Sequence, residues 1–305
     1  MTKHTSLKVT VIGLGSMGLG MAQSIAKGGI AVSGFDLNPA AMTALSENGG
    51  TAAGSAKDAA MDSDILAVVV VNAAQTRAVL FGKDGVAQVM KRGGAILSCA
   101  TMSPSDARQL AQEAEALGLL YLDAPMSGGA AKAATGQLTF MASGTAQAFE
   151  RAKPVLDLVA DKVYNLGDAA GHGASFKMVN QLLAGVHIAA ACEAMTFAAR
   201  LGLDLNTVYE VITASAGNSW MFENRVPHIL DGDYSPRSAI SIFIKDLGIV
   251  SDMARQEKFP LQIASTALQM FLMTAAAGMD NDDDASVARM IADVTGLELP
   301  PAKAS

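Results

Sequence analysis

Hydrophobic residues follow two different patterns along the chain. Up to residue 166, short apolar runs rich in β-branched residues alternate with longer stretches of helical character. Such runs predict buried strands, and they lie at residues 7–12, 30–35, 65–71, 95–99, 119–122, 138–142 and 163–166. Helices are predicted at 19–27, 104–118 and 146–160. Strands that alternate with helices indicate an α/β domain with a doubly wound parallel sheet.

Beyond Gly171 the strand pattern almost disappears. Helical segments are predicted at 172–200, 204–216, 238–256 and 259–277, with glycine and proline residues between them. The pattern therefore predicts an all-helical second domain. The segment 172–200 has so few polar positions that we expect it to be buried nearly all round, and to join the two domains.

A glycine motif follows the first predicted strand and opens the first predicted helix. It reads GLGSMG, and Asp36 closes the second predicted strand 18 residues after Gly18. Strand, glycine loop, helix, strand and acid together are the fingerprint of a Rossmann domain, whose helix N-terminus binds the pyrophosphate of a dinucleotide. The predicted cofactor residues of this region are Gly13, Leu14, Gly15, Ser16, Met17, Gly18 and Asp36.

The cofactor is expected to be NAD rather than NADP. Asp36 would accept hydrogen bonds from the adenosine ribose and would repel a 2′-phosphate, and neither Leu37 nor Asn38 supplies a compensating cation. We therefore predict a Rossmann domain over residues 1–167 and the helical domain over 168–305.

Ligands of such sheets bind beyond the carboxyl ends of the strands. This rule places Val71 and Asn72 beside the cofactor, and Thr101 either in a turn or at the nicotinamide side. The turn Ser127-Gly128-Gly129 exposes backbone N–H groups that suit a carboxylate; a flexible turn is the alternative.

A polar cluster interrupts the start of the apolar segment 172–200. Residues three and four apart share a helix face, so Lys177, Asn180 and Gln181 converge. Lys177 is a candidate acid/base, since a desolvated lysine beside a positive nicotinamide loses proton affinity; a lysine reaching the surface is the alternative. Asn180 or Gln181 would hold a substrate hydroxyl or carboxylate. His172, in the loop before this helix, is a second candidate for the proton acceptor.

A second charged pair, Lys245 and Asp246, lies inside an apolar helical stretch. It either approaches the cofactor or orients Lys177, and a surface ion pair is the alternative.

Composition narrows the function classes. The chain has 305 residues, of which 50% are hydrophobic and 17% charged, and its net charge is −7, which argues against nucleic acid as a partner. The N-terminus lacks the apolar core of a signal peptide and no apolar run is long enough to span a membrane, so we expect a cytoplasmic protein. Cys99 and Cys192 are expected in the core. No metal site is predicted, and the run Asp280–Asp284 is better explained by helix capping around Asp284 and Ser286 than by calcium binding.

Four motifs together resemble the β-hydroxyacid dehydrogenases, which include 3-hydroxyisobutyrate dehydrogenase and tartronate semialdehyde reductase. They are GLGSMG at 13–18, DAPMSGG at 123–129, GHGASFKMVNQ at 171–181 and IKDL at 244–247. The resemblance implies an α/β Rossmann domain plus an all-α C-terminal domain, in the architecture of 6-phosphogluconate dehydrogenase. It also implies that Lys177 is the catalytic acid/base, that Ser127, Gly128, Gly129 and Asn180 bind substrate, and that Lys245 lies near the cofactor.

Further segments resemble a branch of this family that oxidises a four-carbon sugar acid, L-threonate, at C2. They are residues 181–195, 216–226 and 232–248. Ser219 would then serve a substrate hydroxyl, although helix capping explains it as well. This chain departs from that branch at Asn180, where the branch carries histidine and the wider family asparagine. The same-class alternatives are tartronate semialdehyde and 3-hydroxyisobutyrate, and the non-enzyme alternative is a dinucleotide-binding association module. The apolar helix also predicts a homodimer or homotetramer.

Overall fold

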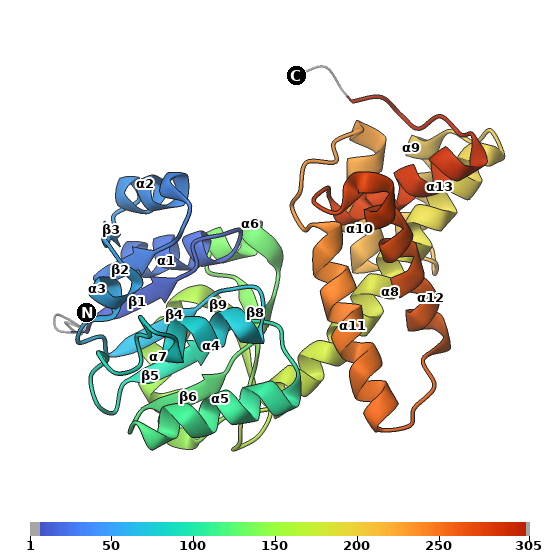
Figure 1. The fold of residues 1–305 in the computed structure, drawn as a ribbon. Coiled ribbons are helices and arrows are strands. Elements are labelled where there is room, and N and C mark those ends of the chain that lie inside the picture. The colour runs from blue at the N-terminus through green and yellow to red at the C-terminus, as the bar shows by residue number, and fades with distance from the viewer. Residues whose placement is uncertain (1–6, 303–305) are drawn as a thin grey trace. The chain divides into compact units, whose positions relative to one another are not determined.

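The computed structural model describes residues 7–302. The expectation that there is no signal peptide rests partly on residues 1–6, which lie outside the described residues. The chain forms two compact units that divide at Lys177 and Met178, inside one long helix (Figure 1). The predicted domain boundary at 167/168, which follows the change from strands to helices, stays a prediction.

A six-stranded parallel sheet forms the centre of the first unit, in the order β3-β2-β1-β4-β5-β6. Its strands are β1 (Val9–Ile12), β2 (Val32–Phe35), β3 (Thr51–Ala52), β4 (Ile65–Val68), β5 (Ala95–Ser98) and β6 (Leu120–Asp123). All four residues of β1, β4 and β5 are buried, as the continuous apolar runs predicted. The order reverses between β1 and β4, and this is where such sheets bind their ligands.

Helices cover both faces of this sheet, and each face has its own apolar cluster. They are α1 (Gly18–Lys27), α2 (Pro39–Glu47), α3 (Ala56–Ala60), α4 (Ala73–Phe81), α5 (Pro104–Ala116), α6 (Gly129–Ala134) and α7 (Ala146–Val159). Ser103 caps α5 as predicted, by accepting a hydrogen bond from the Asp106 N–H. The pattern did not predict α2, α3 or α4, yet each begins after a capping side chain, from Asn38, Ser55 or Asn72.

A separate three-stranded sheet follows β6. It has the order β7-β8-β9, with β7 (Met126–Ser127) antiparallel to β8 (Leu138–Ala142) and β8 parallel to β9 (Ala160–Asn165). The sequence predicted β8 and β9 as strands, but it did not show that they form a sheet of their own. The short strand β7 belongs to the motif at 123–129, so this second sheet holds the Ser-Gly-Gly turn in place.

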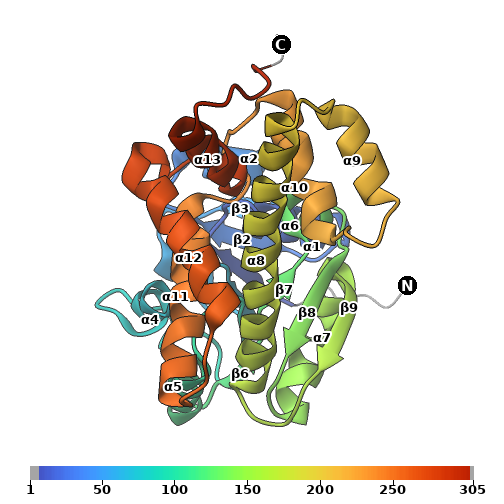
Figure 2. The same cartoon turned by 90° about the vertical axis from the view of Figure 1, so that its right-hand side faces the viewer.

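The second unit is helical, as predicted (Figure 2). It comprises the rest of α8 (His172–Arg200) with α9 (Leu205–Thr213), α10 (Trp220–Asp231), α11 (Ile240–Gln256), α12 (Gln262–Thr274), a π-helical turn η1 (Ala275–Met279), a 3₁₀ turn η2 (Asp284–Ser286) and α13 (Val287–Thr295). Its core includes Cys192, Phe243 and Phe271, and the rings of the two phenylalanines stack at 5.3 Å. Cys99 and Cys192 are both buried, as expected.

Helix α10 was not predicted because Pro227 was taken as a break. A proline cannot donate to the carbonyl four residues before it, which here is that of Glu223. The hydroxyl of Tyr209 donates to this carbonyl oxygen at 3.1 Å instead. A tertiary contact therefore satisfies the group that the proline leaves unbonded, and the helix continues.

The acidic run Asp280–Asp284 also differs from its prediction in detail. The cap of η2 is Asp283, which accepts from the Ala285 N–H, and not Asp284. Asp283 lies 2.7 Å from His228 Nδ1, and although burial acts to raise its pKa, this partner lowers the pKa overall. Burial raises the pKa of Asp284 to about 6 despite its pair with Arg225. Within residues 7–302, no group of three or more His, Cys, Asp or Glu side chains could hold a metal ion.

Helix α8 is less completely buried than the sequence suggested. Its apolar side chains at Phe176, Val179, Leu183 and Phe197 are 56%, 63%, 49% and 63% exposed. By length and composition alone it could span a membrane, contrary to the expectation that no apolar run is long enough, although core helices of soluble proteins share this property. The prediction of burial nearly all round is therefore wrong for one face, because the neighbouring helices of the fold cover only the others.

Candidate active site

The glycine loop packs so tightly that two of its glycines cannot carry a side chain. A Cβ on Gly13 would lie 2.2 Å from the Val69 carbonyl oxygen, and one on Gly18 would lie 1.9 Å from the Gly13 carbonyl oxygen. Gly15 differs, because a Cβ there would meet nothing within 4 Å. The space above Gly15 is the space that a pyrophosphate needs.

Asp36 ties this loop to the end of β2. Its Oδ2 accepts from the Leu14 N–H at 2.6 Å, and its Oδ1 accepts from the Asn38 N–H at 2.8 Å. Each carboxylate oxygen has two lone pairs, so the group can still accept from ribose hydroxyls. Helix α1 begins at Gly18, and its N-cap residue Met17 provides no side-chain hydrogen bond, which leaves the helix N-terminus to a phosphate. These residues fit a bound dinucleotide.

The predicted cofactor residues after β4 and β5 have local roles as well. Asn72 caps α4 by accepting from the Gln75 N–H, and the Val71 N–H donates to the side chain of Gln75, both at 2.8 Å. Val71 is 44% exposed, and Thr101 is half-buried. The contacts of these three residues with a cofactor stay predictions.

Lys177 is buried, with 7% of its surface exposed, so the alternative of a lysine reaching the surface is wrong. Its Nζ donates to the Met126 carbonyl oxygen at 2.9 Å. Met126 precedes the predicted substrate turn, which is held between β7 and α6 and is not a free loop. Gly128 and Gly129 have φ angles of +139° and +72°, which only glycine adopts readily. The lysine amine and the Ser-Gly-Gly turn therefore lie together, as the motifs predicted.

The start of α8 is held by Asp123, a residue that sequence reasoning did not single out. Its buried Oδ2 accepts from the Gly171 and Ala174 N–H groups at 2.8 and 2.9 Å. Ser143 Oγ accepts from the Gly173 N–H at 2.9 Å. Burial raises the pKa of Asp123, while the two N–H donors act to lower it. The available signal was an acid at the end of a buried strand, inside a motif already identified.

Four predicted residues of the second unit form one chain of contacts. Asn180 Nδ2 donates to Gln181 Oε1 at 2.9 Å, Gln181 Nε2 donates to Asp246 Oδ2 at 2.5 Å, and Asp246 Oδ1 lies 2.6 Å from Lys245 Nζ. Asp246 is 1% exposed and Gln181 8%. The pair Lys245–Asp246 is therefore not a surface ion pair.

Two further candidates have structural partners. Ser219 caps α10 by accepting from the Phe222 N–H at 3.0 Å, and this accounts for the residue without a ligand. His172 is the first residue of α8, and its Nδ1 lies 3.0 Å from the Leu166 carbonyl oxygen. This contact joins the start of α8 to the end of the strand segment before it.

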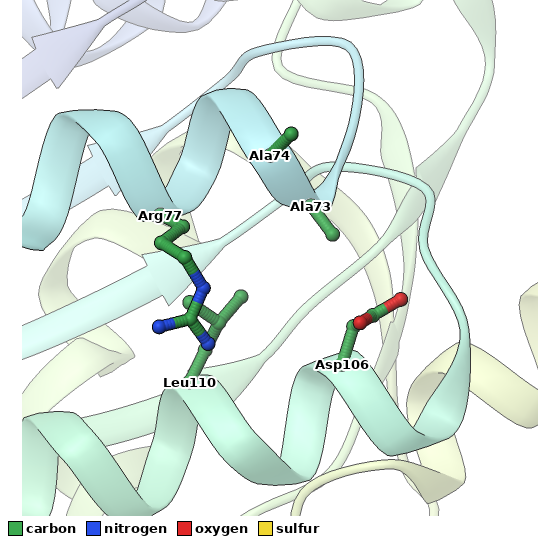
Figure 3. Close-up of a pocket in the computed structure, with 5 residues that line it drawn as sticks. All are labelled: Ala73, Ala74, Arg77, Asp106 and Leu110. Atoms are coloured by element: carbon green, nitrogen blue, oxygen red, sulfur yellow. The ribbon is translucent and has the colours of Figure 1, made fainter. Parts of the chain in front are cut away.

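A pocket of about 320 Å³ lies elsewhere, between α4 and α5 of the first unit. Its lining residues are Ala73, Ala74, Arg77, Asp106 and Leu110 (Figure 3). The guanidinium of Arg77 is already paired with both carboxylate oxygens of Glu113, at 2.8 and 2.7 Å. None of the lining residues is a predicted site residue, so this pocket is not the candidate active site.

Known families match both parts of the chain. Residues 8–167 match the family described as the NAD binding domain of 6-phosphogluconate dehydrogenase. Residues 171–291 match the family described as NAD-binding of NADP-dependent 3-hydroxyisobutyrate dehydrogenase. The two matches together cover the glycine loop, the Ser-Gly-Gly turn and α8.

Individual proteins resemble the chain over nearly its whole length. It is 49% identical to L-threonate dehydrogenase of Haemophilus influenzae over 299 residues, which is 98% of each chain. It is 32% identical to mitochondrial 3-hydroxyisobutyrate dehydrogenase of Rattus norvegicus, over 92% of this chain and 85% of that one. Among solved structures, 3-hydroxyisobutyrate dehydrogenase from Salmonella typhimurium is 52% identical, with a TM-score of 0.90 over 93% of this chain and 99% of that chain.

Two glycines of the loop, Gly15 and Gly18, give a matched test of cofactor binding. We expect Gly15→Ala to leave the melting temperature unchanged and to weaken NAD binding at least ~10-fold, because its methyl group occupies cofactor space and touches no protein atom. Gly18→Ala should instead lower the free energy of unfolding by ~1–3 kcal/mol. Alanine stabilises a helix by ~1 kcal/mol relative to glycine, but the clash with the Gly13 carbonyl costs more than this gain. Calorimetric titration and thermal melting separate the two effects. Unchanged NAD affinity in Gly15→Ala would contradict the placement of the pyrophosphate.

The hydrogen bonds of Asp123 to the start of α8, the Asp123 anchor, predict a stepwise loss of stability when the carboxylate is replaced. Asp123→Ala leaves two buried N–H groups without an acceptor and should lower the free energy of unfolding by ~2–4 kcal/mol. Asp123→Asn keeps one carbonyl oxygen and should lose about half as much. Urea unfolding of both variants measures the difference, and an alanine variant as stable as the wild type would show that the anchor contributes nothing.

Proposed function

The chain belongs to the β-hydroxyacid dehydrogenase family and is an NAD-dependent hydroxyacid dehydrogenase, and from this premise we propose that it oxidises L-threonate at C2 to 2-dehydro-L-erythronate. The reaction removes a hydride from C2 and a proton from the C2 hydroxyl. NAD, when bound, supplies the hydride acceptor. Five L-threonate dehydrogenases that are 48–50% identical over nearly the full length support this substrate.

Lys177 is the proposed proton acceptor. The observation that carries the proposal is the contact of its buried amine with the Met126 carbonyl oxygen, directly before the Ser-Gly-Gly turn. In its neutral form the amine has a lone pair, and it would take the proton of the C2 hydroxyl as the carbonyl forms. A substrate held at the turn would bring its hydroxyl to this amine, which is the positioning that general base catalysis requires.

The turn Ser127-Gly128-Gly129 is the proposed carboxylate holder. It lies before the first helical turn of α6, with half-buried Ser127 and Gly128 and exposed Gly129. Backbone N–H groups without large side chains can approach both oxygens of an anion. The C1 carboxylate of a sugar acid adjoins C2, so a carboxylate held here places the reacting carbon next to Lys177.

Asp36 supports the choice of NAD. Its carboxylate stands at the end of β2, where the adenosine ribose binds in Rossmann domains. A 2′-phosphate at this position would meet a negative charge, and the N–H groups of Leu14 and Asn38 are already bonded to Asp36. The proposed contacts of Val71, Asn72, Thr101 and Lys245 complete the cofactor site.

A second candidate substrate is 3-hydroxyisobutyrate. One observation favours it: the 52% identical solved structure carries the name of that dehydrogenase. Initial rates with L-threonate, 3-hydroxyisobutyrate and glycerate, the alcohol that corresponds to tartronate semialdehyde, each with NAD and NADP, decide between the candidates. We expect the highest kcat/KM with L-threonate and NAD, and no NAD reduction by any four-carbon sugar acid would remove the threonate assignment.

Replacement of Lys177 tests the acid/base role. We expect Lys177→Ala to lower kcat by about 10²–10⁴ with its fold intact, because the variant lacks the proposed proton acceptor. Lys177→Arg should be equally slow, since a guanidinium cannot accept a proton at neutral pH. Lys153→Ala is the matched control, because Lys153 is exposed and pairs with Asp157 on the surface of α7. Steady-state kinetics measure all three, and full activity in Lys177→Ala would refute the mechanism.

We also propose that the protein is a cytoplasmic homodimer or homotetramer. Exposed apolar side chains recur every seven residues along α8, at Leu183, Ala190 and Phe197. A seven-residue spacing keeps side chains on one helix face. Exposed apolar side chains on one helix face are typical of an interface, and a second copy would cover them.

The stripe gives a direct test of assembly. We expect Phe197→Glu to shift the protein to monomers in light scattering at micromolar concentration, because the interface would bury an unpaired charge. Val294→Glu is the matched control, since Val294 is 68% exposed on a different helix. A wild-type protein that is already monomeric would rule out the assembly.

A further inference from the structure

The contacts that end on Asn180 have a fixed direction. They start from the buried carboxylate of Asp246, whose charge is compensated by Lys245 Nζ at 2.6 Å. An ionised carboxylate has only acceptors, so it can bind Gln181 only through the NH₂ group of the amide. The observed bond from Gln181 Nε2 to Asp246 Oδ2, at 2.5 Å, has this direction.

The direction passes on to Asn180. Once the NH₂ group of Gln181 faces Asp246, its carbonyl oxygen Oε1 faces the other way and can only accept. Asn180 must therefore turn its own NH₂ group toward Gln181, and Asn180 Nδ2 lies 2.9 Å from Oε1. The carbonyl oxygen of Asn180 is thus turned away from Gln181. Without the carboxylate, both amides could reverse and Asn180 would present donors only.

We propose that Asp246 is a positioning residue that acts through Gln181 to fix the Asn180 amide, so that its carbonyl oxygen accepts a hydrogen bond from a substrate hydroxyl. The proposal rests on the proposed function, in which Asn180 binds the sugar acid. It separates two alternatives that the sequence left open. A carboxylate oxygen has no hydrogen to donate to a carbonyl oxygen, so the Asn180 carbonyl selects a hydroxyl.

The reaction narrows the choice of hydroxyl further. The C2 hydroxyl gives its proton to Lys177 and becomes a carbonyl, so it cannot remain a donor to Asn180. A hydroxyl that keeps its proton throughout must make this bond. The Asn180 carbonyl therefore recognises the hydroxyl at C3 or at C4. In 3-hydroxyisobutyrate the single hydroxyl is the reacting one, so no hydroxyl remains for this bond.

The test first removes and then restores the fixed direction of the contacts from Asp246 through Gln181 to Asn180, which we call the relay. Asp246→Asn introduces an amide that can donate or accept, so the direction is lost and KM for L-threonate should rise ~10-fold with kcat little changed. The double variant Gln181→Glu with Asp246→Asn moves the carboxylate to the middle position. This relocated carboxylate would accept from the amides on both sides of it, so Asn180 keeps its orientation and KM should return to within about threefold of the wild type.

Substrate analogues supply the second readout. The 3-deoxy and 4-deoxy acids, 2,4-dihydroxybutanoate and 2,3-dihydroxybutanoate, each lack one hydroxyl that Asn180 could bind. For one of these acids the rise in KM caused by Asp246→Asn should disappear, because the hydroxyl that Asn180 binds is missing. An equal rise in KM for L-threonate and both analogues would overturn the proposal and leave Asp246 a purely structural residue. A double variant with the same KM as Asp246→Asn would do the same.

The controls keep the outcome clear. Melting temperatures are measured for every variant, and if Asp246→Asn fails to fold, Gln181→Met breaks the middle link and leaves the buried carboxylate in place. Met has a similar length but neither donor nor acceptor strength, so the same rise in KM is expected. A wild type inactive on all sugar acids would refute the proposed function, whereas an active wild type without the relay effect would refute only the relay.

Discussion

The position of Lys177 depends on one buried carboxylate. Asp123, at the end of β6, accepts from two N–H groups in the first turn of α8 and so joins the helix to the sheet. Helix N-termini leave their first N–H groups unbonded, and a carboxylate there also meets the positive end of the helix dipole. Three residues beyond Ala174 comes Lys177, whose amine then reaches the Met126 carbonyl oxygen. The helix is thereby fixed at the turn that carries the lysine.

The segment 123–129 combines three tasks within seven residues. Asp123 holds the helix, the Met126 carbonyl oxygen receives the lysine, and Ser127-Gly128-Gly129 forms the turn proposed for the substrate carboxylate. Because these three roles fall on neighbouring residues, they form one continuous motif in the sequence. In the second unit Asp246 has a comparable place, because it is buried, paired with Lys245 and bonded to Gln181, which in turn holds Asn180. Both acids act on other groups and need not touch a ligand.

The sequence predicted the long helix and five of the six strands of the main sheet, and it missed the exposed two-residue strand β3. Buried parallel strands are continuous apolar runs, and the glycine loop needs its residues in a fixed order, so both leave a local trace. Helix α10 was missed because the residue that permits it, Tyr209, lies eighteen positions before Pro227. The cap at Asp283 was placed one residue too far along, since three neighbouring aspartates look alike in sequence.

The sequence by itself determined the fold class, the dinucleotide loop and the shared helix face of Lys177, Asn180 and Gln181, because each follows from spacing along the chain. Only the tertiary structure decided that Lys177 is buried on the Met126 carbonyl, that Asp123 anchors α8, and that Asp246 directs Gln181. These contacts join residues 48–65 positions apart. Hydrogen bonds at such separation depend on how helices and strands pack, and no local pattern records the direction in which a side chain donates.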